Sequence, residues 1–318
     1  MTHFDVFNGD ADGICALHQL RLATPTDSVL ISGVKRDIAL LQRVDARPGD
    51  SVTALDISVA VNRPALVALL ERDVRVEYFD HHFAGELPVH CNLTAVIDPS
   101  PGICTGMLVD RHLGGRYRIW AVVAAFGDNL PREGHALAEE LRLSDLQIQD
   151  LRALGETLSY NGYGDAEADL IVHPAALYRT LRRYANPFDF MQVESIYWTI
   201  SESRRVDLER ARVAEPEIRL SGPTIYILPD EPWSRRVRGV LANELAQHFP
   251  DLAHAVLTHN AQGGYTVSVR APLSKGTGAD ALCRRFATGG GRVAAAGINH
   301  LPQDQLPEFV RQLDQAFP

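Results

Sequence analysis

Over the first hundred residues, short apolar segments rich in β-branched and aromatic residues alternate with helical stretches. This alternation is typical of βαβ units, in which a mainly parallel sheet carries helices on both faces. We therefore predict a doubly wound α/β domain. The expected strands are Phe4–Phe7, Ser28–Gly33, Ser51–Leu55, Val74–Phe79 and Leu93–Ile97, and the expected helices are Ile14–Leu22, Ile38–Val44 and Arg63–Arg72.

The rest of the chain divides into a helical part and a second mixed part. From residue 105 to 214 we expect helices broken at Asn129–Pro131, Asn161–Gly164 and Asn186–Pro187, the last helix being Met191–Ala214. Strands follow at Thr224–Leu228, His254–Thr258 and Gly264–Arg270, with helices at Arg235–Gln247, Ala279–Ala287 and Gln303–Ala316. The prediction is an α/β domain with a helical extension over residues 1–185, a helical connector over 186–222 and a smaller α/β domain over 223–318.

Charge and cysteine usage exclude several classes of protein. With 31 basic and 40 acidic residues the net charge is −9, which argues against a broad basic surface for duplex nucleic acid. A small anionic substrate, or a short single strand in a local basic groove, stays compatible. Cys15, Cys91, Cys104 and Cys283 show no paired spacing, so we expect reduced thiols rather than a zinc ribbon or a disulfide framework.

The sequence also bears on location. The first residues lead directly into a strand and a polar turn, without the pattern of a signal peptide. The longest apolar run, Ile119–Phe126, is too short to span a bilayer. We expect a cytoplasmic protein with no membrane partner. The sequence leaves the oligomeric state open, a homodimer included.

Three of the expected strands end at a carboxylate. In a doubly wound sheet the carboxyl ends of the strands lie along one edge, where ligands bind, so these side chains are expected to converge. The residues are Asp10 and Asp12 after the first strand, Asp56 after the third, and Asp80-His81-His82 after the fourth.

Such a cluster suits a divalent cation. Magnesium and manganese prefer oxygen ligands, and manganese also accepts imidazole. A further carboxylate, Asp128, follows the apolar helix Ile119–Phe126 and is expected to close the cluster. Taken singly, each motif is also compatible with a helix cap, a helix terminator or a solvated turn. Their occurrence at equivalent strand ends favours a metal site.

These motifs resemble those of the DHH phosphoesterase superfamily, and the resemblance covers nearly the whole chain. Asp10-x-Asp12-Gly13 is similar to the first motif, Asp56 to the second, Asp80-His81-His82 to the third and Asp128 to the fourth. In the C-terminal part, residues 288–297 resemble the glycine-rich signature of the DHH-associated domain, Ser268-Val269-Arg270 its strand arginine motif, and residues 238–243 a helix start found there.

The resemblance implies a metal-dependent phosphoesterase. It would hydrolyse phosphomonoester or phosphodiester bonds of a nucleotide or short single-stranded oligonucleotide by a metal-activated hydroxide. Two metal ions are implied, manganese first and magnesium as the alternative. Asp56 would bridge them, Asp10 would hold one ion, and Asp12, His81 and Asp128 the other. His82 would contact the phosphate or protonate the leaving group, and Asp80 would orient a histidine.

In the C-terminal domain the resemblance assigns substrate binding to five residues. Glycines let backbone N–H groups approach an anion closely, and arginines donate forked hydrogen bonds to phosphate. The alternative for the arginine inside the glycine loop is a merely solvated side chain. The residues are Arg270, Gly289, Gly290, Gly291 and Arg292.

The chain departs from the family pattern around the first metal. Val6 stands where many members have a histidine, Asn8 where exonuclease-like members have an aspartate, and Arg292 where the signature has a histidine. The first metal is therefore expected to be weakly held, completed by the Asn8 amide oxygen or water, or absent. The rival hypothesis is a non-catalytic nucleotide-binding or sensor protein with a degraded first metal site.

The substrate stays open within the enzyme class. The relatives considered are oligoribonucleotide and phosphoadenosine phosphatases, cyclic dinucleotide phosphodiesterases and the exonuclease RecJ, the last being less expected for a short, acidic chain. Aromatic residues that stack on bases would help to decide, although most aromatics at helical spacing belong to the core. The candidates are Phe83, Trp120, Tyr160, Tyr163 and Trp198.

Overall fold

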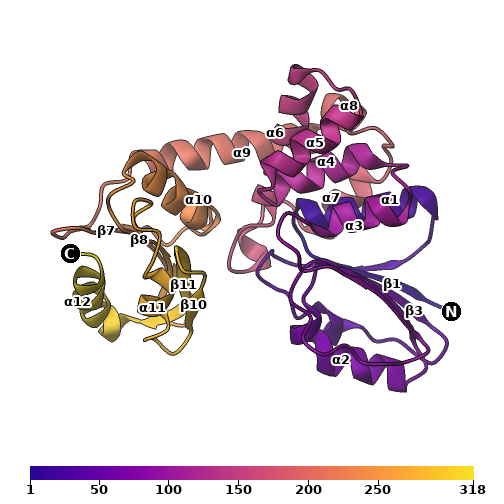
Figure 1. Ribbon diagram of the computed structural model, residues 1–318, viewed down its shortest axis with the longest axis horizontal. Helices are drawn as coiled ribbons and strands as arrows, with labels where there is room; N and C mark the ends of the chain where they lie inside the picture. Colours follow the sequence, from indigo (N-terminus) through magenta and orange to yellow (C-terminus); the bar gives the residue numbers. More distant parts are fainter. The chain divides into compact units, whose positions relative to one another are not determined.

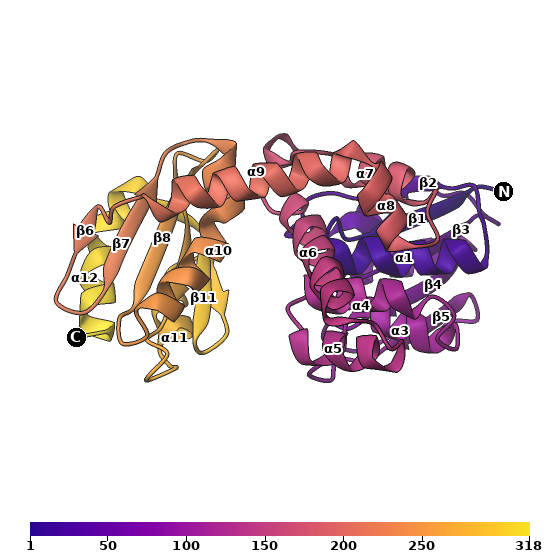
Figure 2. The same ribbon diagram turned by 90° about the horizontal axis from the view of Figure 1, so that it is seen from above.

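The computed structural model describes all residues from 1 to 318. Its internal contacts divide the chain into two compact units, Met1–Arg204 and Arg205–Pro318. The boundary falls within helix α9 (Ser195–Arg212), inside the segment expected to be a connector (Figure 2). No helix combines the length and the apolar character that a membrane crossing requires.

Unit 1 contains a five-stranded, fully parallel sheet. Its order is β2-β1-β3-β4-β5, with every neighbouring pair in register. The α/β class with a parallel first sheet is therefore confirmed. After β1 the chain forms β2 on one side of it and then crosses to form β3 on the other side. The topological switch point of the sheet therefore lies between β1 and β3. The strands are β1 (His3–Phe7), β2 (Val29–Ile31), β3 (Ser51–Leu55), β4 (Arg75–Asp80) and β5 (Leu93–Ile97).

Helices cover both faces of this sheet (Figure 1). Helix α2 (Val59–Glu71) lies on one face, where its leucines pack against Phe4 and Val6 of β1. Helices α1 (Ala11–Ala23) and α3 (Thr105–His112) lie on the other face and contact each other. Apolar burial on both faces explains why the strands read as nearly continuous apolar runs.

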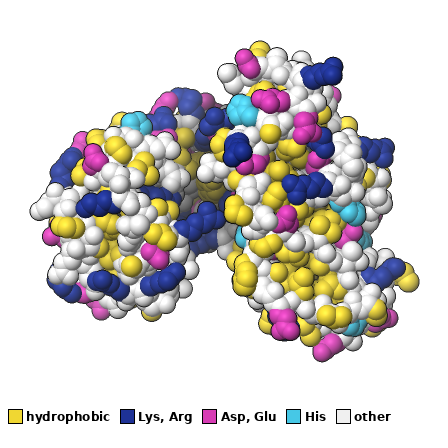
Figure 3. All heavy atoms as spheres, viewed as in Figure 1, with side chains coloured by type: hydrophobic (Ala, Val, Ile, Leu, Met, Phe, Trp, Pro, Cys, Tyr) yellow, Lys and Arg dark blue, Asp and Glu magenta, His cyan; other side chains and the backbone are white.

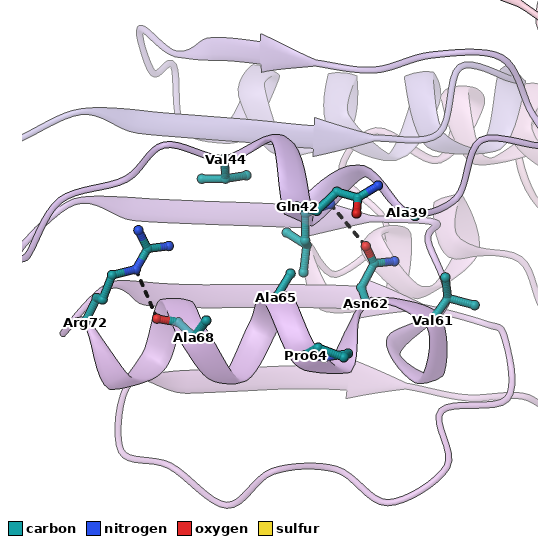
Figure 4. Close-up of a pocket in the computed structure, with 10 residues that line it drawn as sticks. Ala39, Gln42, Val44, Val61, Asn62, Pro64, Ala65, Ala68 and Arg72 are labelled. Atoms are coloured by element: carbon teal, nitrogen blue, oxygen red, sulfur yellow. Dashed lines mark hydrogen bonds between the residues drawn. The ribbon is translucent and has the colours of Figure 1, made fainter.

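The helix expected at Ile38–Val44 is wrong, since the segment forms only one 3₁₀ turn, η1 (Leu40–Arg43). Asn62 of α2 explains the difference. Its side chain is buried, accepts a hydrogen bond from the N–H of Leu41 (3.1 Å) and donates one to the carbonyl of Ile38 (2.6 Å). These backbone groups are thus satisfied by a side chain instead of by a helix. Figure 4 shows the first of these bonds beside a hollow between η1 and α2.

The helical part breaks where the sequence predicts. Its elements are α4 (Arg118–Gly127), α5 (Pro131–Glu140), α6 (Asp145–Asn161), η2 (Glu167–Asp169), α7 (Pro174–Leu181) and α8 (Pro187–Val193). The expected single helix Met191–Ala214 is wrong at its start, because Met191 belongs to α8 and α9 begins at Ser195. Glu194 has an extended backbone between them, and its carboxylate binds Tyr184 and Arg183 (2.5 Å each).

Unit 2 contains a mixed six-stranded sheet in the order β10-β11-β9-β8-β7-β6. Only β7 and β8 pair in parallel. Three strands were not expected from the sequence, namely β6, β10 and β11, and the helix expected at Ala279–Ala287 ends at Cys283. The elements are β6 (Ile218–Arg219), β7 (Thr224–Leu228), α10 (Pro232–His248), β8 (His254–Asn260), β9 (Gly264–Arg270), α11 (Ala279–Cys283), β10 (Gly289–Gly291), β11 (Ala295–Pro302), η3 (Gln303–Gln305) and α12 (Leu306–Ala316).

The surface carries charges of both signs. On the face shown in Figure 3, basic and acidic side chains are interspersed with apolar ones, without one continuous basic area. The mixed charges on this face are consistent with the net charge of −9.

Candidate metal centre

The carboxyl edge of the unit 1 sheet gathers the strand-end carboxylates. Asp56 follows β3 directly, Asp80 ends β4, and Asp10 follows β1 after a short turn, so three neighbouring strands contribute. All three are almost fully buried. Asp56 adopts a left-handed backbone, with φ of 58°, which aspartate tolerates better than most residues. The switch point of the sheet therefore carries a dense group of carboxylates.

Asp10 caps helix α1. Its Oδ1 accepts hydrogen bonds from the N–H groups of Asp12 (3.1 Å) and Gly13 (3.2 Å). The turn is tight, because a Cβ on Gly13 would lie 2.3 Å from the Asn8 carbonyl oxygen. The interpretation of Asp10 as a helix cap is compatible with its interpretation as a metal ligand, because the cap also orients the carboxylate.

Asp12 is held by a second helix start. The backbone N–H groups of Thr105 and Gly106, at the beginning of α3, donate to its two oxygens at 2.8 and 2.7 Å. Gly106 leaves room for this approach, since a Cβ there would lie 2.4 Å from the Cβ of Ala124. The sequence analysis did not single out Thr105 and Gly106. A Thr-Gly pair opening a helix directly before the apolar helix α4 is the signal that points to them.

His81 directs one ring nitrogen at the carboxylates. Its Nδ1 lies 2.8 Å from the carbonyl oxygen of Ile103, which only accepts, so Nδ1 carries the proton. Nε2 then presents its lone pair to Asp56 Oδ1 (3.4 Å), Asp128 Oδ2 (3.8 Å) and Asp12 Oδ2 (3.9 Å). Three carboxylate oxygens around an imidazole lone pair form an arrangement that a cation stabilises.

Asp128 sits at the C-terminal end of helix α4, as its C-cap residue. A helix C-terminus carries partial negative charge, so a carboxylate is unfavourable there in the absence of a cation. The following residue, Asn129, takes the left-handed conformation (φ 58°) that ends the helix. A cation beside Asp128 offsets this unfavourable position, and within the chain Lys35 Nζ lies 3.5 Å from its Oδ1.

Asp80 and His82 form a separate pair. His82 Nδ1 lies 2.7 Å from Asp80 Oδ1, and the other oxygen of the buried Asp80 has no hydrogen-bond partner within the chain. The hydrogen bond to Asp80 raises the pKa of His82, and burial opposes it only in part. His82 thereby retains an imidazolium at higher pH than a free histidine does.

The electrostatics of the cluster show an excess of negative charge. Burial and the charges of Asp12, Asp10, Asp128 and Asp80 raise the pKa of Asp56 well above its usual value. Burial, together with Asp12, raises the pKa of Asp128 to about 6, although Lys35 lowers it in part. These carboxylates therefore compete for protons, as they would for a metal ion.

Two groups of side chains could hold a divalent ion. In each group the candidate ligand atoms lie within 4.8 Å of one another, and the donors are carboxylate oxygen and imidazole nitrogen, which suit manganese. The groups are Asp12, His81 and Asp128, and Asp56, His81 and His82. Together with the lone pair of His81 at the carboxylates, this donor set fits a divalent metal.

Asp10 lies outside both groups, and a lysine binds it. Lys35 Nζ lies 2.6 Å from Asp10 Oδ2 and 3.5 Å from Asp128 Oδ1. Burial lowers the pKa of Lys35, but the charges of Asp10, Tyr163 and Asp128 outweigh it and raise the pKa well above its usual value. Lys35 was not expected from the sequence, although this residue follows β2 at the same carboxyl edge of the sheet as the other motifs.

Asn8 is also engaged within the chain. Its amide oxygen accepts a hydrogen bond from the N–H of Asp10 (3.3 Å), and its amide nitrogen donates to the carbonyl of Lys35 (3.1 Å). Completion of the first metal site by the Asn8 oxygen stays a prediction. Asn8 fixes the loop that carries Lys35.

In unit 2 the predicted substrate residues lie at one end of the sheet. Arg270 ends β9, opposite Ala295, and Arg292 exchanges two backbone hydrogen bonds with Ala295 in the turn between β10 and β11. The Arg270 guanidinium donates to Asn243 (2.6 Å), and the Arg292 side chain is exposed. The two arginines are therefore brought together by the strand register.

The glycine triplet forms a strand, which was not expected from the sequence. Gly289–Gly291 form β10, an edge strand paired with β11. A Cβ on Gly289 would lie 1.8 Å from the Cys283 carbonyl oxygen, and one on Gly291 would lie 2.5 Å from the Ala296 Cα, whereas Gly290 has open space. Packing alone thus demands two of the three glycines.

The aromatic residues considered for stacking on bases differ in how far their side chains are exposed. Trp120 and Tyr160 are fully buried core residues and offer no ring to a ligand, and Tyr163 is half-buried. Phe83 and Trp198 have exposed side chains, 77% and 60%. Phe83 directly follows His82, so it is the exposed aromatic ring nearest in sequence to the centre.

The comparisons with known proteins rest on structure. No protein-family model matches the sequence, and no curated protein matches it significantly. Among solved structures, exonuclease RecJ bound to manganese superposes with a TM-score of 0.63 and 17% identity, over 99% of this chain and 89% of RecJ.

Two further structures are similar. RecJ from Thermus thermophilus in complex with Mn²⁺ has a TM-score of 0.59 at 18% identity, and the match covers 99% of this chain but only about half (51%) of that protein. The pGpG-specific phosphodiesterase PggH from Vibrio cholerae has a TM-score of 0.58 at 13% identity, over 99% of both chains. At these identities the comparisons establish architecture. The chain has a RecJ-like fold.

Proposed function

We propose that this chain is a divalent-metal-dependent phosphoesterase that hydrolyses phosphoester bonds of a nucleotide or a short oligonucleotide. The observation that carries the proposal is the position of His81, whose Nε2 lies 3.4 to 3.9 Å from the oxygens of Asp56, Asp128 and Asp12. Such a donor set at the switch point of a parallel sheet is the usual place and chemistry for binding a metal and a phosphate.

Asp12, Asp56, His81 and Asp128 would hold the metal. When bound, a divalent ion lowers the pKa of water and neutralises charge on phosphoryl oxygens. The chain's own contribution is orientation. The N–H groups of Thr105 and Gly106 fix both oxygens of Asp12, and the Ile103 carbonyl fixes the ring of His81. These bonds hold the ligands in place before metal and substrate arrive.

His82 is the proposed proton donor to the leaving oxygen. Its Nδ1 is bound to Asp80, so the proton on Nε2 is the one that it can transfer. The raised pKa keeps this ring protonated to higher pH than a free histidine, and a general acid must carry its proton. Asp80 acts as the positioning residue that holds the ring and its charge.

The nucleotide assignment rests on three supports. RecJ is an exonuclease and PggH a pGpG-specific phosphodiesterase, and both share this fold. Phe83 offers an exposed ring for stacking on a base, next in the chain to His82. Arg270 and Arg292 in unit 2 are the proposed phosphate-binding residues.

A substrate panel tests the proposal. Purified protein is treated with chelator, supplied with manganese or magnesium, and assayed with short RNA, short DNA, pGpG, phosphoadenosine phosphate and cyclic dinucleotides. We expect hydrolysis of at least one of these that requires the metal and that is lost in Asp56→Asn, a variant that keeps the size and tolerates the left-handed backbone.

The same panel distinguishes the non-catalytic alternative. Tight binding of a nucleotide without turnover, under conditions in which the metal is bound, would identify a nucleotide-binding protein and contradict the phosphoesterase. Hydrolysis that is equally fast in chelator would contradict the metal dependence.

A further inference from the structure

The chain contains only two lysines, Lys35 and Lys275, among its 31 basic residues. Lys35 is the one placed at the candidate metal centre, where its ammonium lies between Asp10 and Asp128. An ammonium is a compact charge that fits between two carboxylates, unlike the wide planar guanidinium that this chain otherwise uses.

The position of Lys35 is fixed by its backbone. Its N–H donates to the carbonyl of Gly162 (2.7 Å), and its carbonyl accepts from the side chain of Asn8 (3.1 Å). Gly162 packs against the first motif, since a Cβ there would lie 3.2 Å from the Cα of Asp10. Hydrogen bonds thus connect the loop after β2 with the loop after β1 and with the end of α6. The lysine side chain points at Asp10.

Both oxygens of Asp10 are consequently in use. Oδ1 accepts the N–H groups that open α1, and Oδ2 binds the lysine. The two groups of side chains whose ligand atoms come close enough to share an ion do not include Asp10, and they are Asp12, His81 and Asp128, and Asp56, His81 and His82. A divalent ion on Asp10 would have to displace the ammonium or lie beside it, where like charges repel.

We propose that the Lys35 ammonium takes the place of one cation of the centre, so that the protein binds a single divalent ion, on Asp12, Asp56, His81 and Asp128. The inference rests on the proposed metal-dependent function and narrows it. The four carboxylates Asp10, Asp12, Asp56 and Asp128 carry four negative charges, of which one divalent ion and one lysine neutralise three.

Metal counting tests this without any need for turnover. Protein freed of metal is dialysed against manganese, the bound ion is counted by elemental analysis, and its electron paramagnetic resonance spectrum is recorded. We expect one equivalent per chain in the wild type, with the spectrum of an isolated ion. In Lys35→Met, which keeps the length and removes the charge, we expect a second equivalent and the spectrum of two coupled ions.

Matched variants separate the charge of the lysine from its effect on folding. Lys275→Met removes the other lysine and is expected to bind one equivalent, and Lys35→Arg keeps the charge and is expected to stay at one. Thermal unfolding verifies the fold of each variant. If Lys35→Met does not fold, the wild-type count still decides the stoichiometry.

The contradicting outcomes are distinct. Two coupled ions in the wild type would overturn this inference and leave the phosphoesterase standing. One equivalent in a folded Lys35→Met would overturn the role of the lysine. No bound metal, with no hydrolysis of any substrate, would overturn the proposed function itself and this inference with it.

Discussion

His82 Nδ1 lies 2.7 Å from Oδ1 of Asp80, whose second oxygen is buried without a partner in the chain. The charge of Asp80 raises the pKa of His82 through this bond. The consequence is kinetic. Because the acid form of His82 is lost as pH rises through its pKa, hydrolysis should fall along the alkaline limb of the pH–rate profile.

Asp80→Asn should move that limb to lower pH and reduce kcat at pH 8 by about 100-fold, within the range of general acid catalysis. The measurement is kcat against pH for both proteins. Asp98→Asn, at the end of the neighbouring strand, is the control, since Asp98 binds Ser100 and Arg111 instead. An unchanged profile in Asp80→Asn would remove His82 from the proton transfer.

Gly106 should be intolerant of even a methyl group. In Gly106→Ala the new Cβ would meet Ala124 at 2.4 Å and Asp12 Oδ1 at 3.2 Å, so we expect a loss of about 1–3 kcal/mol in stability and weaker manganese binding. Gly239→Ala, in α10, has open space and should gain about 0.5–1 kcal/mol. Thermal unfolding and manganese titration check both variants. Equal behaviour of the two would contradict the packing argument.

The metal-free protein should carry a pH-dependent penalty at Asp128. Burial and Asp12 raise its folded pKa from 3.8 to about 6, so the folded state binds more protons between these values and stability falls as pH rises through that window. The penalty, about 3 kcal/mol at most, is complete above pH 6.

Asp128→Asn should therefore gain stability relative to the wild type as pH increases from 4 to 7.5, when both are measured in chelator. The measurement is the free energy of unfolding by urea at each pH, and the difference between the proteins cancels the titration of other groups. Manganese at pH 7.5 should reverse the order, because it stabilises the wild type more. A difference that is constant with pH would contradict the assigned shift.

The three glycines of β10 should differ from one another. Gly289→Ala places a Cβ 1.8 Å from a backbone oxygen and should cost about 2 kcal/mol or more. Gly290→Ala meets no atom and should change stability by less than about 0.5 kcal/mol, yet raise KM if the phosphate approaches this glycine closely enough for a Cβ to obstruct it. Unfolding curves and steady-state kinetics separate the two effects. An unchanged KM in Gly290→Ala would confine the triplet to a structural role.

The strand ends of unit 1 could be predicted because a short apolar run fits a buried parallel strand, and the carboxylate after it marks the point where the strand leaves the core. Asp10, Asp56 and Asp80 follow β1, β3 and β4, and helix starts and stops at asparagine, glycine and proline fall where expected. What escaped prediction depends on tertiary contacts. Asn62 replaces a helix by a 3₁₀ turn, and the strand Gly289–Gly291 has low intrinsic β propensity but a partner in β11.

The set of site residues predicted from the sequence was incomplete for the same reason. Motif spacing led to the acidic and histidine ligands, whereas Lys35 lies in an irregular loop after β2 and has no motif around it. Its role depends on two carboxylates that are distant in sequence, Asp10 and Asp128. Thr105 and Gly106 bind Asp12 through backbone N–H groups, so the search for side-chain ligands did not reveal this contact.

The most direct test of the account is manganese-dependent hydrolysis of bis-p-nitrophenyl phosphate by the wild type and by His81→Ala, with His90→Ala as the control. His90 is an exposed histidine of the loop before β5. The account predicts turnover in the wild type and in His90→Ala, abolished by chelator, and a loss of at least about 100-fold together with weaker manganese binding in His81→Ala. Turnover by folded His81→Ala at the wild-type rate would contradict it.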